Sequence, residues 1–440
     1  MTPEKSGPDA SDAAGLPDKS EDEIADSAAF DGLLPDDGDH HHQALHSNGK
    51  VWERSLSRTA TTPTGGQSTA WGTEPNDDAP FSLGARPPGS EQIYGALDLG
   101  TNNCRLLLAR PSRRGFRVVD AFSRIIRLGE GVSQTGYLSE LAMNRTMDAL
   151  KICAGKLQRH NVKRTRLVAT QACRVASNGP AFVANVKNRF DLDIEILTPE
   201  IEAHLAVAGC ATLIDPNTDY VLVFDIGGGS SEIIWLDMTR LGGRQDVLTG
   251  RSDVDDAIVA WESLPVGVVT LAERFGGRDV TKESFAAMVD AVTKLLLPFE
   301  AKHNFRERTA GKPVHFLGTS GTVTTIAGVM LGLDRYDRKR VDGIWLGSGE
   351  IDDVTSELLS QTYDERVNQP CIGRERADLV LAGCAILDAI LKLWPADRLR
   401  VADRGLREGI LMRLMMEDGV WRAGRRRRGR GKRAKGAQKS

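Results

Sequence analysis

The chain has 440 residues, of which 40% are hydrophobic and 27% are charged, so its length predicts two or three folded domains with buried cores. Its six cysteines lie far apart without a Cys-x-x-Cys pair, which argues against a zinc ribbon and against a disulfide framework. The first thirty residues are acidic and lack an apolar stretch, and no segment approaches the ~20 apolar residues of a membrane helix. We therefore expect a cytoplasmic protein without membrane contact.

The formal net charge of -3 combines two tails of opposite character. Residues 1–92 are rich in Asp, Glu, Pro, Gly and Ser, a composition that predicts a disordered acidic extension. The histidines at 40–42 and 46 are interpreted as part of a solvated polar tract rather than as a metal site. Residues 421–440 contain ten Arg and Lys and are predicted to form a disordered basic tail, suited to nonspecific contact with nucleic acid or another polyanion.

In chain order, the folded part is expected to begin with an apolar run at 92–96. It enters the turn Asp-Leu-Gly-Thr-Asn at 98–102 and leaves through a second apolar run, which predicts a strand, a tight turn and a strand. Residues 117–128 and 166–170 are predicted to be further strands. Between them, Ser139 is placed to cap an amphipathic helix.

A second strand, turn and strand is predicted at 220–236, around the turn Asp-Ile-Gly-Gly-Gly-Ser at 225–230. The repeated device fits two domains built on one plan. After a polar excursion at 238–258, the pattern predicts a helix that begins at 281 and ends near 298–302. A strand at 314–317 then enters a third turn at 318–322, which leads into an apolar helix. Two further helices begin at 376 and 404.

Each of the three turns combines glycine with hydroxyl residues after an apolar strand. Glycines allow a phosphate to approach the backbone closely and let successive N–H groups point at it, although a Gly-rich turn often only reverses the chain. No Walker A sequence and no dinucleotide-binding Gly-x-Gly-x-x-Gly after a strand is present. The candidate phosphate-binding residues of these turns are Thr101, Asn102, Gly227, Gly228, Gly229, Ser230, Gly318, Ser320 and Gly321.

Asp98 and Asp225 stand at the ends of apolar strands, directly before a glycine turn. A carboxylate buried there would be costly unless it met a metal ion or a hydrogen-bond donor. Actin-like ATPases and sugar kinases hold a metal over phosphate with two carboxylates at facing hairpins. We therefore expect Mg²⁺, or another divalent cation, at Asp98 and Asp225.

Seven segments, in register over about residues 93–417, resemble the Ppx/GppA phosphatases, which comprise exopolyphosphatases and guanosine pentaphosphate phosphohydrolases of the actin-like superfold. They are residues 96–102, 169–174, 195–203, 224–232, 264–267, 318–322 and 402–409. The resemblance implies that Glu202 is the catalytic glutamate that activates water, although a surface Glu near a helix start is the simpler alternative. It also implies that Asp225 serves the metal or the attacking water and that Glu232 is a further metal candidate. Asn102, Arg174, Gly228, Gly229 and Ser230 match phosphate-contacting positions.

The fold implied is α/β, with two actin-like (ribonuclease H-like) domains around a central cleft and disordered tails at both ends. The first domain is expected over 93–216, together with the last helix near 400–420, and the second over 217–397. Hydrolysis of the terminal phosphate of inorganic polyphosphate is the leading function, and guanosine pentaphosphate is the alternative substrate. An actin-like kinase, a catalytically silent sensor of polyphosphate or nucleotides, and a homodimer stay open.

Overall fold

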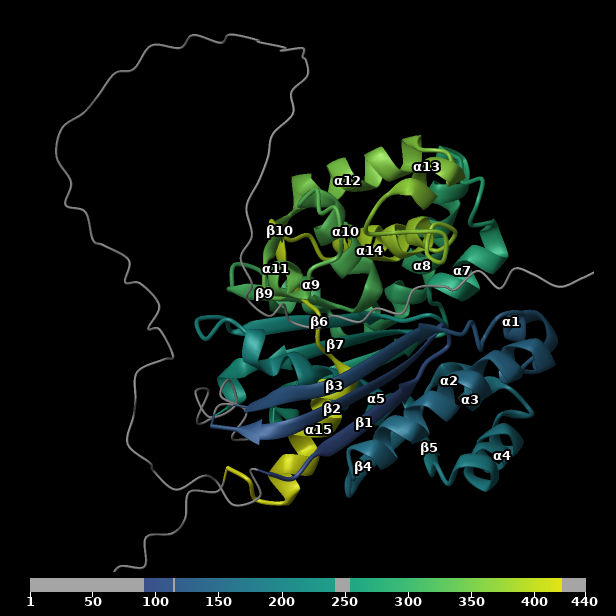
Figure 1. Cartoon of the computed structure of the whole chain (residues 1–440). Coiled ribbons are helices and arrows are strands. Elements are labelled where there is room, and N and C mark those ends of the chain that lie inside the picture. Colours follow the sequence, from purple (N-terminus) through teal and green to yellow (C-terminus); the bar gives the residue numbers. More distant parts are fainter. Residues whose placement is uncertain (1–90, 114, 242–253, 422–440) are drawn as a thin grey trace, which may run out of the picture. The chain divides into compact units, whose positions relative to one another are not determined.

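The computed structural model describes residues 91–113, 115–241 and 254–421, all of which belong to one compact unit, Pro80–Ser440. The predicted acidic extension up to residue 90, its histidines, the basic tail from residue 422 and most of the polar excursion lie outside the described residues. Two β-sheets with helices packed on them make up the described part (Figure 1). The domain boundaries expected from the sequence stay a prediction.

The first sheet has the strand order β3-β2-β1-β4-β5. Its strands β1, β2 and β3 are antiparallel neighbours, whereas β4 and β5 run parallel to β1. Alternate residues of β2 face opposite sides, since Leu106 and Leu108 join one core cluster and Leu107 joins another. The strands are β1 Tyr94–Leu99, β2 Asn103–Ser112, β3 Gly115–Ile125, β4 Arg164–Ala169 and β5 Ile194–Ile196.

The second sheet has the order β10-β11-β9-β6-β7-β8 and repeats the antiparallel hairpin of the first sheet in β6 and β7. Trp235 of β7 stacks on Phe305 at a ring-centroid distance of 4.5 Å in the core beneath this sheet. The strands are β6 Tyr220–Ile226, β7 Ser231–Asp237, β8 Ile258–Leu264, β9 Val314–Thr319, β10 Trp345–Gly347 and β11 Arg398–Ala402.

Helix α5 (Pro199–Cys210) packs against both sheets, because Leu205 joins a cluster with the first sheet while Ala203 and Val207 join a cluster with the second. Helix α15 (Leu406–Glu417) lies on α5 and on β1 (Figure 1). The long helices that cover the outer faces are α2 Glu140–Arg159 and α4 Gly179–Phe190 on the first sheet, and α8 Lys282–His303 and α14 Val380–Leu393 on the second. The remaining helices are α1 Val132–Thr135, α3 Gln171–Val175, η1 Ala211–Leu213, η2 Met238–Arg240, η3 Asp255–Ala257, α7 Val268–Phe275, α9 Phe305–Arg308, α10 Ser320–Met330, α11 Arg338–Val341, α12 Ser348–Ser360 and α13 Tyr363–Asn368.

Both predicted hairpins and the Ser139 cap of α2 are confirmed, since the Ser139 hydroxyl accepts the Ala142 N–H. The predicted turn at 318–322 is wrong, because β9 continues through Thr319 and α10 begins at Ser320. Helix α8 runs through Pro298 and ends at His303, one residue beyond the predicted end near 298–302, with Phe299 packed in the core. In the described part of the chain, no helix is both long and apolar enough to cross a membrane.

Candidate functional site

The two glycine turns predicted from the sequence lie against each other. A Cβ added to Gly228 would stand 3.0 Å from Thr101 Cβ and 3.2 Å from the Asn102 backbone nitrogen, and one on Gly229 would stand 2.7 Å from Thr101 Oγ1. Only glycine permits so close an approach. Asn102 is buried, and its Oδ1 has no hydrogen-bond partner within the described residues. The structure therefore brings these four predicted residues together and leaves a polar side-chain atom available to a ligand.

Helix α7 fixes the peptide planes of the second turn. The Val268 N–H donates to the Gly227 carbonyl (3.0 Å) and the Val269 N–H donates to the Gly228 carbonyl (2.8 Å). In a trans peptide the carbonyl and the following N–H point in opposite directions, so the N–H groups of Gly228 and Gly229 point away from α7. Two successive N–H groups on one side form an arrangement that binds anions.

The aspartates of the two hairpins have cross-strand partners that differ in charge: one partner is positive and the other is negative. Asp98 in β1 pairs with Arg105 in β2, whereas Asp225 in β6 pairs with Glu232 in β7. Because directly opposed residues of an antiparallel pair project from the same face, each aspartate meets the charge of its partner. The first hairpin is therefore compensated locally, and the second accumulates negative charge.

The pKa values of the two aspartates follow from burial and from these partners. Burial raises the pKa of Asp98, and the positive charge of Arg105 opposes the rise. Burial and the charge of Asp98 raise the pKa of Asp225 to about 6, and the charge of Arg105 opposes this rise. Asp225 is consequently a carboxylate that a nearby cation would hold in its ionised form.

Glu232 is also buried, with 2% of its surface exposed. Its Oε1 accepts hydrogen bonds from the hydroxyls of Ser230 (2.8 Å) and Ser263 (2.9 Å). Burial, followed by the charge of Asp225, raises the pKa of Glu232 to about 7. The Ser230 hydroxyl thus orients Glu232 in this structure, and its predicted contact with phosphate stays a prediction.

Glu202 lies in the first turn of α5, which Thr198 caps by accepting the Ile201 N–H (3.4 Å). The Arg174 guanidinium donates to Glu202 Oε2 at 2.9 Å. Burial, followed by the charge of Glu232, raises the pKa of Glu202 well above its usual range, and Arg174 opposes this rise. Glu202 therefore lies within electrostatic reach of the second hairpin although it belongs to neither hairpin.

Arg174 of α3 was predicted to contact phosphate. In the structure its guanidinium also donates to the Leu197 carbonyl (2.8 Å) and, through Nη2, to Gln171 Oε1 (2.6 Å). With Glu202, these acceptors occupy its Nη1 and Nη2 groups. In the structure Arg174 is therefore bonded to Glu202 and its surroundings, and its contact with phosphate stays a prediction.

The third predicted segment divides into two parts. Gly318 lies inside β9, where an added Cβ would stand 2.7 Å from the Phe224 ring, so packing explains this glycine. Ser320 has a positive φ of 78°, which is rare for a residue other than glycine, and its hydroxyl donates to the Ile226 carbonyl (2.5 Å). A Cβ on Gly321 would meet no atom within 4 Å. Ser320 and Gly321 thus lie next to the hairpin that carries Asp225, at the start of α10, and their contact with phosphate stays a prediction.

The sequence interpretation missed two arginines whose charges lower the pKa of Asp98. They are Arg105 and Arg407, and neither forms a side-chain hydrogen bond or an ion pair with another described residue. Burial lowers the pKa of Arg407. The hairpin register could have revealed Arg105, because a tight turn after Asp98 places it directly opposite.

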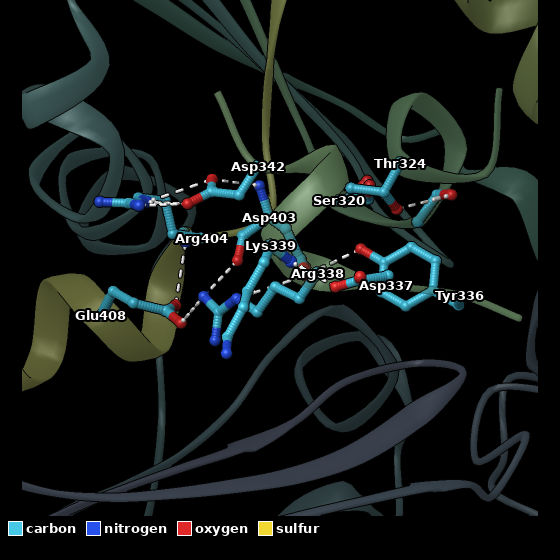
Figure 2. A network of polar contacts seen from close by, with 12 residues as sticks. Ser320, Thr324, Tyr336, Asp337, Arg338, Lys339, Asp342, Asp403, Arg404 and Glu408 are labelled. Atoms are coloured by element: carbon cyan, nitrogen blue, oxygen red, sulfur yellow. Dashed lines mark hydrogen bonds and ion pairs between the residues drawn. The ribbon is translucent and has the colours of Figure 1, made fainter. Parts of the chain in front are cut away.

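A polar network holds the turn before α15 against the site (Figure 2). The Arg338 guanidinium binds the Asp403 carbonyl and Glu408 Oε1 (2.9 Å), and Glu408 in turn accepts the Gly405 N–H (3.0 Å). A Cβ on Gly405 would stand 3.9 Å from Asp225 Oδ2. The matching segment at 402–409 thus has a positioning role that the sequence alone did not assign.

The three predicted metal ligands influence one another's pKa values. The charge of Asp98 raises the pKa of Asp225, and the charge of Asp225 raises the pKa of Glu232. Among the described residues, no three His, Cys, Asp or Glu side chains gather closely enough to hold a metal ion by themselves. The Mg²⁺ site expected from the sequence stays a prediction.

Comparison with known proteins identifies the family. The model of the Ppx/GppA phosphatase family matches residues 108–418. The chain belongs to the Ppx/GppA phosphatase family. Solved structures of family members include one from Aquifex aeolicus (29% identity, TM-score 0.59, covering 74% of this chain and 98% of that chain). An exopolyphosphatase from Cytophaga hutchinsonii has 25% identity and a TM-score of 0.64, over 75% of this chain and 99% of that chain. The predicted actin-like α/β fold is confirmed.

Two curated relatives are named guanosine-5'-triphosphate,3'-diphosphate pyrophosphatase. The protein from Photobacterium profundum is 28% identical over 73% of this chain, and the protein from Vibrio vulnificus is 27% identical over 75% of it. The match covers only 59% and 60% of these relatives, so the chain spans less than two thirds of their length.

Proposed function

We propose that this Ppx/GppA family member hydrolyses the terminal phosphate of inorganic polyphosphate, with guanosine pentaphosphate as the alternative substrate. The observation that carries the proposal is Glu202, a mostly buried carboxylate whose Oε2 accepts a hydrogen bond from the Arg174 guanidinium at 2.9 Å. A general base must be ionised to take a proton from water, and the Arg174 contact favours the ionised form of Glu202.

The surrounding residues supply binding and charge neutralisation, which dominate the catalysis of phosphoryl transfer. The N–H groups of Gly228 and Gly229, the side chain of Asn102 and the guanidinium groups of Arg105 and Arg407 would contact phosphate oxygens. Mg²⁺ at Asp225, with Asp98 or Glu232 nearby, would neutralise charge on the phosphoryl oxygens.

In the proposed reaction, water attacks the terminal phosphorus and its oxygen forms the new P–O bond. The bond to the bridging oxygen breaks, and the shortened chain leaves with that electron pair. Glu202 accepts the proton of the attacking water, while Arg174 keeps its carboxylate oriented. Each cycle releases one inorganic phosphate.

The names of the similar proteins support both substrates, because one is called an exopolyphosphatase and the curated relatives carry the guanosine name. The test incubates the pure protein with Mg²⁺ and long-chain polyphosphate, guanosine pentaphosphate, or ATP with small-molecule acceptors, and measures released phosphate and phosphorylated acceptor. Release from polyphosphate that Glu202→Gln abolishes supports the proposal, and the rate ratio ranks the two substrates. Phosphorylated acceptor would indicate a kinase, and binding without turnover would indicate a sensor.

A further inference from the structure

Two charged side chains, Glu273 and Arg127, connect the segment after β3 to the elements of the second sheet. Glu273 of α7 accepts the Gly131 N–H through Oε1 (2.7 Å) and the Ser133 hydroxyl through Oε2 (2.5 Å). Arg127 donates from both terminal nitrogens to the Asp378 carboxylate, at 2.9 and 3.0 Å. Bidentate and charge-assisted hydrogen bonds of this kind are the stronger ones.

On the side of the first sheet, the same segment is bonded directly to the Asp98 turn. The Arg127 N–H donates to the Asn102 carbonyl (3.1 Å), and the Gly129 N–H donates to the Thr101 carbonyl (2.9 Å). A Cβ on Gly129 would stand 2.3 Å from Thr101 Cγ2, so the backbone at Gly129 is packed directly against the Thr101 side chain. Any displacement of this segment would therefore move the turn that carries Thr101 and Asn102.

On the side of the second sheet, the helix that carries Glu273 is bonded to the Asp225 turn. Its Val268 and Val269 N–H groups hold the Gly227 and Gly228 carbonyls. A Cβ on Gly277, just after the helix, would stand 2.0 Å from the Asp378 carbonyl oxygen, so the partner of Arg127 is packed against the end of the same helix. The contacts of Glu273 and of Arg127 thus both lead to α7.

We propose that Glu273 and Arg127 are positioning residues that fix the Asp98 turn relative to the Asp225 turn, so that one phosphate chain meets both turns at once. This inference rests on the proposed function. Arg127 adopts a positive φ of 46°, an unfavourable backbone conformation that persists only where surrounding contacts impose it. The simpler alternative is that these partly exposed pairs add only local stability, as most surface ion pairs do.

The experiment compares Glu273→Ala and Arg127→Ala with two matched controls. In Glu350→Ala the lost carboxylate accepts a glycine N–H, that of Gly347, within the second-sheet elements (2.8 Å). In Arg166→Ala the lost arginine binds Glu195 through two nitrogens within the first sheet (3.0 and 3.2 Å). Each full-length variant is assayed for kcat and KM of phosphate release with Mg²⁺ and polyphosphate, and for backbone hydrogen exchange without substrate.

For Glu273→Ala we expect the KM to rise roughly tenfold, the loss typical of a hydrogen bond to a charged group, with a smaller change in kcat. Amide exchange should accelerate in both turns, at 98–104 and 225–231, and Arg127→Ala should act in the same direction. The controls should leave KM and exchange in both turns within about twofold, as expected for exposed pairs. Glu273→Gln, which retains an acceptor for the Gly131 N–H, should recover part of the loss.

An unchanged KM with unchanged exchange in Glu273→Ala would overturn the inference, and so would equal effects of the controls. Should the unmodified protein release no phosphate from any substrate, the proposed function fails. The exchange measurement still decides whether Glu273 and Arg127 couple the two turns.

Discussion

The β1–β2 and β6–β7 hairpins share a backbone plan but differ in charge. In each, an aspartate stands next to last in the first strand, before a glycine turn, with one charged residue opposite it in the second strand. That residue is Arg105 in the first hairpin and Glu232 in the second. The parallel neighbour also differs, because Asp98 lies beside Val168 whereas Asp225 lies beside Thr319.

The difference in charge suits the two hairpins to different ligands, namely phosphate at the first and a divalent cation at the second. The two turns lie against each other, so the cross-strand side chain of each hairpin decides which charge that hairpin adds to the site. Arg105 adds positive charge where phosphate would lie, whereas Glu232 adds negative charge that a divalent cation would neutralise. The predictions below test this division, beginning with the residue that faces both hairpins.

Glu202→Gln should have the largest effect, because the charges of Glu232 and Asp98 both act on this carboxylate. We expect kcat for phosphate release to fall by about 10²–10⁴, the usual contribution of general-base catalysis. The substitution preserves side-chain shape and an acceptor for Arg174, so the melting temperature should not fall. Turnover near that of the unmodified protein would remove Glu202 from the proposed mechanism.

Arg105→Ala tests the positive character of the first hairpin. Loss of a hydrogen bond between charged groups should raise the KM for polyphosphate by roughly 10–100-fold. The magnesium concentration needed for half-maximal activity should stay unchanged, because Arg105 is not a metal ligand and the substitution leaves Asp98 and Asp225 in place. Steady-state kinetics at several magnesium concentrations measures both quantities, and a shift in the metal requirement alone would contradict the division.

Unlike Arg105→Ala, Asp225→Asn should raise the magnesium concentration needed for half-maximal activity. It should also stabilise the metal-free protein at pH 8. The pKa of Asp225 is raised from 3.8 to about 6, so its folded form holds a proton that the unfolded form releases. Its stabilising contribution is full below pH ~4 and is lost as the pH rises through ~6.

Removing this ionisation should increase the free energy of unfolding at pH 8 by up to about 3 kcal/mol, since one pKa unit corresponds to about 1.4 kcal/mol. Asp98→Asn is the matched comparison and should gain less, because Arg105 and Arg407 already oppose the rise in its pKa. Thermal unfolding without divalent cations tests both variants. An equal gain in the two would show that the hairpins do not differ in electrostatic balance.

The stability of the unmodified protein should also depend on pH, because the carboxylates of the second hairpin have raised pKa values. The pKa of Glu232 is raised from 4.5 to about 7, so it adds to the loss of stability as the pH rises through ~7. We expect the melting temperature of the metal-free protein to fall between pH 5 and 8. Added Mg²⁺ should reduce this fall, and a melting temperature that rises over the interval would count against the raised pKa values.

The smallest expected effect concerns the basic tail, which would add to the phosphate attraction assigned to Arg105. Val420 is buried and the Trp421 indole donates to the Ser112 carbonyl (2.9 Å), so a truncation should follow Trp421. Turnover of long polyphosphate at low concentration should fall a few-fold and depend less on salt, as expected for nonspecific polyanion binding. Guanosine pentaphosphate should be hydrolysed as before, and equal losses on both substrates would contradict a capture role.

The sequence predicted the parts of the site that depend on local patterns. Both hairpins follow from glycine between aliphatic runs, and the family resemblance supplied Glu202 and Arg174. Gly318 resembled a turn residue because the side chain that it packs against, Phe224, lies far away in the sequence, although the two strands are neighbours in the sheet. The contact of Glu273 with Gly131 joins residues 142 positions apart, and no periodicity or motif marks either of them. Contacts between elements therefore account for most of what the sequence could not predict.

The position of α15 also bears on how the chain is synthesised. Its Ile410 and Leu411 cover the face of the first sheet that carries Ala96 and Leu107, although β4 of that sheet already ends at Ala169. At about 5–20 residues per second, the ribosome needs on the order of ten seconds to a minute to reach Glu417 after making β4. During this interval Leu205 of α5 can cover part of this apolar face, but the area under α15 stays exposed until the last helix emerges.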